Sequence, residues 1–116
     1  MERRYDTRIP IDLPVKYAIL GSDYDRLAGH VRDVSEGGLR MTTDIVLNVG
    51  AFLRIQLEDC VLFGEVKYCC PWMGGYVSGC YVERVLLGDS EISRLISVTL
   101  QEVPRVNSMA WTGQAG

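Results

Sequence analysis

The sequence contains a series of short segments in which apolar and polar residues alternate, and this series constrains the fold most strongly. A period of two puts neighbouring side chains on opposite faces of a strand, so each segment can bury only one face. The segments span residues 11–20, 26–34, 37–44, 52–57, 60–70 and 76–87, and turn-forming residues separate them. Six short strands at this spacing predict an all-β barrel or sandwich.

The alternation also predicts which side chains face the core. The expected inward sets are Val15, Tyr17 and Ile19; Leu39, Met41 and Thr43; Leu53, Ile55 and Leu57; and Leu62, Gly64, Val66 and Tyr68. The stretch Pro71-Trp-Met-Gly-Gly75 predicts a hairpin turn. Trp72 and Tyr76 flank this turn, where either cross-strand packing or contact with a partner would explain them.

Near the C-terminus the apolar period changes from strand to helix. Ile92, Leu95, Ile96 and Leu100 recur at helical spacing, which predicts one amphipathic helix that could cover an open barrel end. We expect Asp89 to cap its first turn and Pro104 to end it. The predicted organisation is one domain over residues 1–103, followed by a flexible tail over residues 104–116.

Composition narrows the classes of function. A chain of 116 residues with 47% hydrophobic and 23% charged residues is typical of one folded domain. Its net charge of −3 and pI near 5.1 argue against binding to long nucleic acids. There is neither an apolar run of membrane-spanning length nor a secretory signal pattern, so a cytoplasmic protein is expected.

Cysteine and histidine do not indicate catalysis or metal binding. The four cysteines, Cys60, Cys69, Cys70 and Cys80, form no CxxC pair, and His30 is the only histidine. Vicinal Cys69 and Cys70 would point to opposite faces of a strand, which argues against their binding one metal. We expect small buried thiols in a reducing compartment, with no metal, no cofactor and no enzymatic nucleophile–base pair.

An arginine-rich arm precedes the first segment. Arg4 and Arg8 are four positions apart, and Arg3 adds a third guanidinium. Guanidinium groups grip phosphates through paired N–H donors and stack on nucleotide bases. Taken alone, the spacing favours the simpler interpretation of a solvated, disordered N-terminus.

A second unusual stretch, Asp33-Val-Ser-Glu-Gly-Gly38, interrupts the alternation between the second and third segments. The Asp33 carboxylate could accept hydrogen bonds from the N–H edge of a guanine, and the Ser35 hydroxyl could donate or accept one, while Gly38 allows close backbone approach or positive φ. A β-turn with side-chain capping is the other interpretation. Arg32 and Arg40 bracket the stretch, and either proximity to a ligand or surface ion pairs would account for them.

Taken together and in this order, the two motifs resemble the PilZ domain family. Arg4-Tyr-Asp-Thr-Arg8 matches the RxxxR arm of that family, and Asp33-Val-Ser-Glu-Gly-Gly38 matches its [DN]xSxxG motif. The wider opening "ERRYDTRIPIDLPVKY" is also similar to the start of such domains. The resemblance covers roughly residues 2 to 100.

The resemblance implies a six-stranded antiparallel β-barrel with one C-terminal helix that binds the second messenger cyclic di-GMP without enzymatic activity. It implies that Arg4 and Arg8 hold phosphates and stack on guanine, and that Asp33 and Ser35 read a guanine edge. The full implied site is Arg3, Arg4, Arg8, Asp33, Ser35, Gly37 and Gly38. Arg3 would favour two stacked ligand molecules over one.

Two positions depart from the family pattern. Val82 stands where the family often has phenylalanine, three residues after Gly79, and this change should affect packing more than ligand contact. Glu36 adds negative charge beside an anionic ligand, at small cost if its side chain reaches solvent.

The expected mechanism is conformational: ligand binding orders residues 1–8 against the barrel, and the ordered arm changes the surface that a downstream protein partner meets. The main alternative is a PilZ-like adaptor that acts by protein contact without nucleotide. A barrel that binds single-stranded nucleic acid is a weaker alternative, because the chain is acidic.

Overall fold

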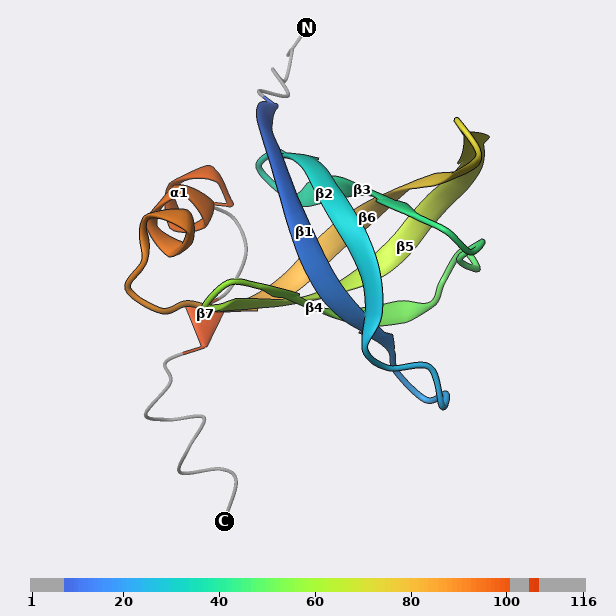
Figure 1. Ribbon diagram of the computed structural model, residues 1–116. Coiled ribbons are helices and arrows are strands. Elements are labelled where there is room, and N and C mark those ends of the chain that lie inside the picture. Colours follow the sequence, from blue (N-terminus) through green and yellow to red (C-terminus); the bar gives the residue numbers. More distant parts are fainter. Residues whose placement is uncertain (1–7, 101–104, 107–116) are drawn as a thin grey trace, which may run out of the picture.

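The computed structural model describes residues 8–100 and 105–106, and its regular elements form one closed sheet and one helix (Figure 1). The strands are β1 (Ile9–Ile19), β2 (Leu27–Val34), β3 (Gly38–Thr43), β4 (Phe52–Leu57), β5 (Cys60–Trp72), β6 (Gly75–Leu86) and β7 (Arg105–Val106); the helix is α1 (Glu91–Thr99).

The first six strands close into an antiparallel barrel. The hydrogen-bonded order is β3-β2-β1-β4-β5-β6, and β3 pairs with β6 to complete the circle. Closure leaves no open edge between the first and last strands of this set, which removes a site for unwanted strand pairing. The predicted six-stranded antiparallel barrel with a C-terminal helix is therefore confirmed.

The barrel interior is filled by the inward residues of every strand. The fully buried side chains include Val31, Val34, Leu39, Met41, Leu53, Ile55, Leu57, Leu62, Val66, Val82 and Val85. The predicted inward sets of β3 and β4 are buried as expected, and Val15 and Tyr17 of β1 are buried as well. Burial raises the pKa of the Tyr17 hydroxyl, because the phenolate would be poorly solvated there. Val82, the departure from the family pattern, packs in this core.

One predicted face is wrong at its end. Leu62, Gly64 and Val66 point inward, but Tyr68 is 41% exposed. The pairing of β5 with β6 shifts between Val66 and Tyr68, as a β-bulge does. One extra residue at a bulge reverses the alternation, so Tyr68 lies on the outer surface.

The helix lies against one end of the barrel, on the opposite side of the molecule from the projecting β5–β6 hairpin (Figure 1). Ile96 and Leu100 join the core, and this confirms the predicted covering role. The N-cap is Ser90 rather than the expected Asp89: the Ser90 side chain accepts a hydrogen bond from the backbone N–H of Ser93. The helix ends at Thr99, before the residue expected to end it, Pro104, which lies outside the described residues.

A seventh strand was not predicted. β7 pairs in parallel with the end of β6, matching Val85 with Arg105 and Leu86 with Val106. These two residues belong to the segment expected to be a flexible tail; the remainder of that segment lies outside the described residues. Within the described part of the chain, no helix is long and apolar enough to cross a membrane.

Candidate functional site

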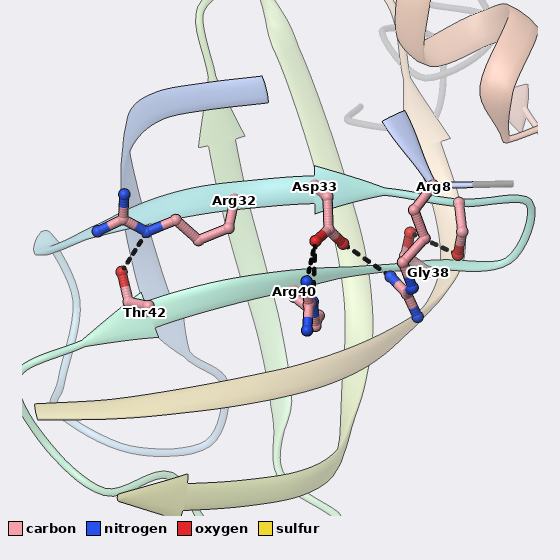
Figure 2. Close-up of polar contacts among 7 residues, drawn as sticks. Arg8, Arg32, Asp33, Gly38, Arg40 and Thr42 are labelled. Atoms are coloured by element: carbon pink, nitrogen blue, oxygen red, sulfur yellow. Dashed lines mark hydrogen bonds and ion pairs between the residues drawn. The ribbon is translucent and has the colours of Figure 1, made fainter. Parts of the chain in front are cut away.

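Asp33 is the centre of a charged network on the outer surface of the barrel. Its Oδ1 accepts a hydrogen bond from Arg8 Nη1 at 2.7 Å, and its Oδ2 accepts two from Arg40, from Nε at 2.8 Å and Nη2 at 2.5 Å (Figure 2). The Asp33 side chain is 7% exposed, whereas those of Arg8 and Arg40 are 38% and 44% exposed. The two guanidinium groups therefore cover the carboxylate and present their own outer edges to solvent.

A β-bulge in β2 creates this geometry. Val31 pairs with Met41, but the next paired position joins Asp33 to Arg40, so Arg32 is the extra residue. Paired residues share a face of the sheet, and Arg40 points outward. The bulge thus turns Asp33 to the outer surface. Without it, regular alternation from buried Val31 would have pointed Asp33 into the core.

Two guanidinium groups share the single carboxylate of Asp33, and both are partly exposed beside it. The hydrogen bonds that Arg40 donates to Asp33 raise the pKa of Arg40, and the neighbouring Tyr68 raises it further, so this arginine stays charged. A partly exposed cation beside a buried, oriented carboxylate can bind an anion and accept hydrogen bonds from N–H groups at one place.

The loop after Asp33 is a tight turn attached to β6. The Ser35 backbone N–H donates to the Gly38 carbonyl at 2.8 Å, and the Ser35 hydroxyl approaches the same carbonyl at 3.5 Å. The Gly37 carbonyl accepts from the Val82 N–H at 2.8 Å. Ser35 is buried, and its two contacts to Gly38 agree with the interpretation of a turn with side-chain capping. Glu36 is only partly exposed.

Gly38 is required by the neighbouring strand. A Cβ atom at this position would lie 2.3 Å from the backbone oxygen of Cys80, which no side chain can tolerate. Gly38 does not have positive φ, which was one of the two reasons suggested by the sequence. The other reason was close approach of the ligand; the group that approaches Gly38 within this structure is the backbone of β6.

Of the three arm arginines, the structure describes only Arg8. The sequence predicted that the whole arm, residues 1–8, is unanchored without ligand; Arg8 is instead bound to Asp33 at the start of β1. Arg3 and Arg4 lie outside the described residues.

Arg32 and Arg40, which the sequence left equivalent, have different roles. Arg40 belongs to the Asp33 network, whereas Arg32 points away from it in Figure 2. Arg32 donates to the Thr42 hydroxyl at 3.1 Å and to the Asp12 carboxylate at 3.0 Å. Its guanidinium also lies 5.7 Å from the centre of the Trp72 ring, a cation–π contact.

The Arg32 side chain and the hairpin tip border a groove of about 740 Å³ that does not include Asp33. Trp72 packs against Arg32. This contact was not among the two interpretations of Trp72 from the sequence, which were cross-strand packing and contact with a partner.

Two tyrosines beside the network were missed by sequence reasoning. Tyr68 lies against Gly79, where a Cβ would come within 2.2 Å of its ring, and next to Arg40. Tyr81 is half exposed, and its ring lies 3.6 Å from the position a Gly37 Cβ would take. Aromatic side chains on the outer face of strands can indicate a stacking surface. The sequence pattern assigned Tyr68 to the inner face, because the bulge before it was not foreseen.

The cysteines are free, and none belongs to a metal-binding cluster among the residues that the structure describes. Burial raises the pKa values of Cys60 and Cys80 to about 12, so both thiols stay protonated at neutral pH. Cys70 is exposed, which corrects the expectation that all four are buried; its neighbour Cys69 is half-buried and faces the other way, as predicted.

Comparison with known families identifies the chain. The model of the PilZ domain matches residues 2–98, and a search of curated proteins found no match. The match covers most of the 116 residues, so the chain belongs to the PilZ domain family. PilZ domains are non-enzymatic, and the family generally binds cyclic di-GMP.

Proposed function

We propose that this protein is a cyclic di-GMP receptor whose binding site is built around Asp33. Family membership supports the ligand, and the observation that carries the site is the pairing of one buried carboxylate with two partly exposed guanidinium groups. Cyclic di-GMP combines two phosphodiester charges with two guanine bases. A site for it needs cations for the phosphates and a carboxylate for the N–H edge of guanine, and both are adjacent here.

In this proposal the ligand exchanges partners with Asp33. A phosphate takes the Arg8 guanidinium, and the freed Oδ1 of Asp33 accepts N–H groups of guanine. Arg40 keeps its two hydrogen bonds to Oδ2, and so holds the carboxylate in position during the exchange. A partly exposed ion pair is worth on the order of 1 kcal/mol, so releasing Arg8 costs little compared with the new charge-assisted bonds.

The remaining family residues complete the proposed site. Arg4 joins Arg8 on the phosphates, while Ser35 and Gly37 line the turn that the guanine approaches. Tyr68 beside Arg40 and Tyr81 beside Gly37 offer partly exposed rings suited to stacking on a base. Arg3 adds a further guanidinium plane, and we expect it to favour two stacked ligand molecules.

Signal transmission follows from ordering of the arm. Residues 1–8 close over the ligand and change the surface offered to a downstream protein in the cytoplasm, where the messenger acts. This cost in backbone entropy is offset by charge-assisted hydrogen bonds and stacking.

The test is isothermal titration calorimetry of the purified protein with cyclic di-GMP, with GTP as the control ligand. We expect saturable heat for cyclic di-GMP only, at a ratio of two ligands per chain. A ratio near one would exclude the stacked pair and leave the receptor assignment intact. A folded protein that gives no heat would contradict the receptor and favour an adaptor that acts by protein contact.

A further inference from the structure

A second group of cations lies on a different part of the barrel from Asp33. Lys16 of β1, Arg26 before β2, Arg54 of β4 and Arg84 of β6 are all exposed. Among the residues that the structure describes, none of the four has an ion-pair partner, in contrast to Arg8, Arg32, Arg40 and Lys67. In a chain of net charge −3, unpaired cations gathered on one face form a local positive field.

Strand pairing brings three of these positions together with an aromatic residue. Lys16 is paired with Gln56, two positions along β4 from Arg54. Arg54 is paired with Phe63, and Phe63 in turn with Arg84. Paired residues share a face, so Arg54, Phe63 and Arg84 form a row across β4, β5 and β6 on the outer surface.

The surface contains two hollows, one lined by Arg54 and the other by Phe63, its pairing partner on β5. The first, of about 460 Å³, is lined by Lys16, Tyr17, Arg26, Arg54 and Gln56, and has no acidic residue in its lining. The second, of about 290 Å³, is mostly apolar and is lined by Leu20, Phe52, Leu53, Phe63, Glu83, Arg84 and Leu86. Leu20 and Phe52 are 44% and 45% exposed, so the second hollow leaves large apolar side chains open to solvent.

We propose that this surface, the two hollows together, binds an acidic amphipathic segment of a partner protein. Carboxylates of the segment pair with Lys16, Arg26 and Arg54, and one bulky apolar side chain fills the hollow between Phe52 and Phe63. Charge complementarity carries the choice of partner: cations that lack internal partners favour an acidic surface and repel a basic one. The apolar hollow supplies the anchor point typical of protein interfaces.

Small anions and membranes fit the same surface less well. Built sites for small anions use backbone N–H groups at turns or helix N-termini, whereas the N–H groups of β1 and β4 here face their strand ladders. Membrane contact requires apolar side chains that protrude, but Leu20, Phe52 and Phe63 line a concavity.

The experiment is a titration of the isotope-labelled full chain with short synthetic peptides, followed by NMR chemical shifts. The first peptide carries several Glu residues around a single Leu, the second has Gln in place of Glu, and the third has Ser in place of Leu. We expect shifts centred on Arg54 and Phe63 with the first peptide only, and weaker binding at higher salt.

Two charge-reversal variants sharpen the test. Arg54→Glu should weaken binding of the first peptide at least about tenfold, because it replaces attraction by repulsion. Arg94→Glu is the matched control: Arg94 is also exposed and without an ion-pair partner among the described residues, but lies on α1, and the variant should bind like wild type.

Three results would each overturn the proposal. They are binding of the Gln peptide as strong as that of the Glu peptide, chemical-shift changes that map away from Arg54 and Phe63, and unchanged binding by Arg54→Glu. Preferential binding to vesicles of anionic phospholipid, lost in Arg54→Glu, would overturn it in favour of a membrane. Cyclic di-GMP titration of the same samples separates this proposal from the receptor function, since the peptide result does not depend on nucleotide binding.

Discussion

Two aspartates, Asp33 and Asp59, each accept several hydrogen bonds, but from different kinds of donor. Asp33 receives three from the guanidinium groups of Arg8 and Arg40, which are 25 and 7 residues away in the sequence. Asp59, in the turn between β4 and β5, receives four from the start of the helix. Oδ2 accepts the backbone N–H groups of Asp89 and Ser90, and Oδ1 accepts the hydroxyls of Ser90 and Ser93.

The kind of donor decides whether an aspartate can exchange its hydrogen-bond partners or keeps them fixed. The donors to Asp59 lie within five consecutive residues at one helix end, so they are placed together when the helix forms. They hold the pKa of Asp59 well below its usual range, the Ser90 hydroxyl contributing most. The donors to Asp33 are ends of long side chains that can turn to another anion without moving the backbone. We infer that Asp59 serves stability and Asp33 serves binding.

Replacing each aspartate should give opposite results, and this is the largest effect that we expect. Asp33→Ala should lower the affinity for cyclic di-GMP at least about a hundredfold, which corresponds to about 2.7 kcal/mol, with little change in thermal stability. Asp59→Ala should lower the melting temperature and leave the affinity unchanged. Calorimetric titration and thermal unfolding of both variants measure the two effects.

Asp12→Ala is the matched control for Asp33→Ala, because Asp12 also pairs with an arginine, Arg32, on the barrel surface. Asp12→Ala should bind normally. If both alanine variants lose affinity equally, Asp33 has no special role.

The two arginines should divide the binding function. Arg8→Ala should abolish most binding of cyclic di-GMP while leaving the fold intact, because Arg8 lies outside the core. Arg40→Gln should lower affinity about tenfold, or about 1.4 kcal/mol, because Asp33 loses its fixed partner. It should also reduce the preference for cyclic di-GMP over cyclic di-AMP, which is an effect on specificity that mere destabilisation would not produce.

Calorimetry with both dinucleotides checks this division, and Arg32→Ala serves as the control outside the network. A wild-type affinity in Arg8→Ala would refute the proposed role of the arm. An unchanged preference in Arg40→Gln would show that Arg40 does not position Asp33 for guanine.

Removing the helix cap should affect stability alone. Ser90→Ala loses both the bond to the Ser93 N–H and the bond to Asp59, and should lower the free energy of unfolding by about 1 kcal/mol, as is usual for an N-cap. Urea unfolding monitored by circular dichroism measures it. Ser22→Ala, in an exposed loop, is the control. A loss of cyclic di-GMP affinity in Ser90→Ala would break the separation of the two regions.

Asp59 should also give the protein a characteristic acid sensitivity. Its pKa is lower in the folded state than in the unfolded chain, so the unfolded state binds more protons as the pH falls. The stabilisation by Asp59 is complete above the unfolded value, about 3.9, and is lost progressively below it. Asp59→Asn should therefore lose less stability than the wild type when the pH falls from neutral to values near and below the pKa of Asp59 in the unfolded chain. Urea midpoints for both proteins check this, and parallel pH profiles would contradict it.

Regular strands and the helix were predictable because their pattern of buried residues depends on neighbours within the same segment. The alternation of Leu53, Ile55 and Leu57 was sufficient to identify their buried face, and the helical spacing of Ile96 and Leu100 was sufficient to predict a covering helix. The failures fall beside bulges and caps. Tyr68 follows a bulge that reverses its face, and the N-cap of α1 is Ser90 in a cluster bound by Asp59, about thirty positions earlier.

Six short strands, one helix and the two motifs could be identified from the chain alone, since each depends on residues close together in the sequence; the alternation left barrel and sandwich open, and the resemblance to the family implied the barrel. The choice of Arg40 rather than Arg32 as the partner of Asp33 came from the folded structure, because a bulge in β2 sets which side chains share a face. The same holds for Gly38, whose need arises from the backbone of β6. Long-range strand register fixes these contacts, and register depends on how all six strands close together rather than on any one segment.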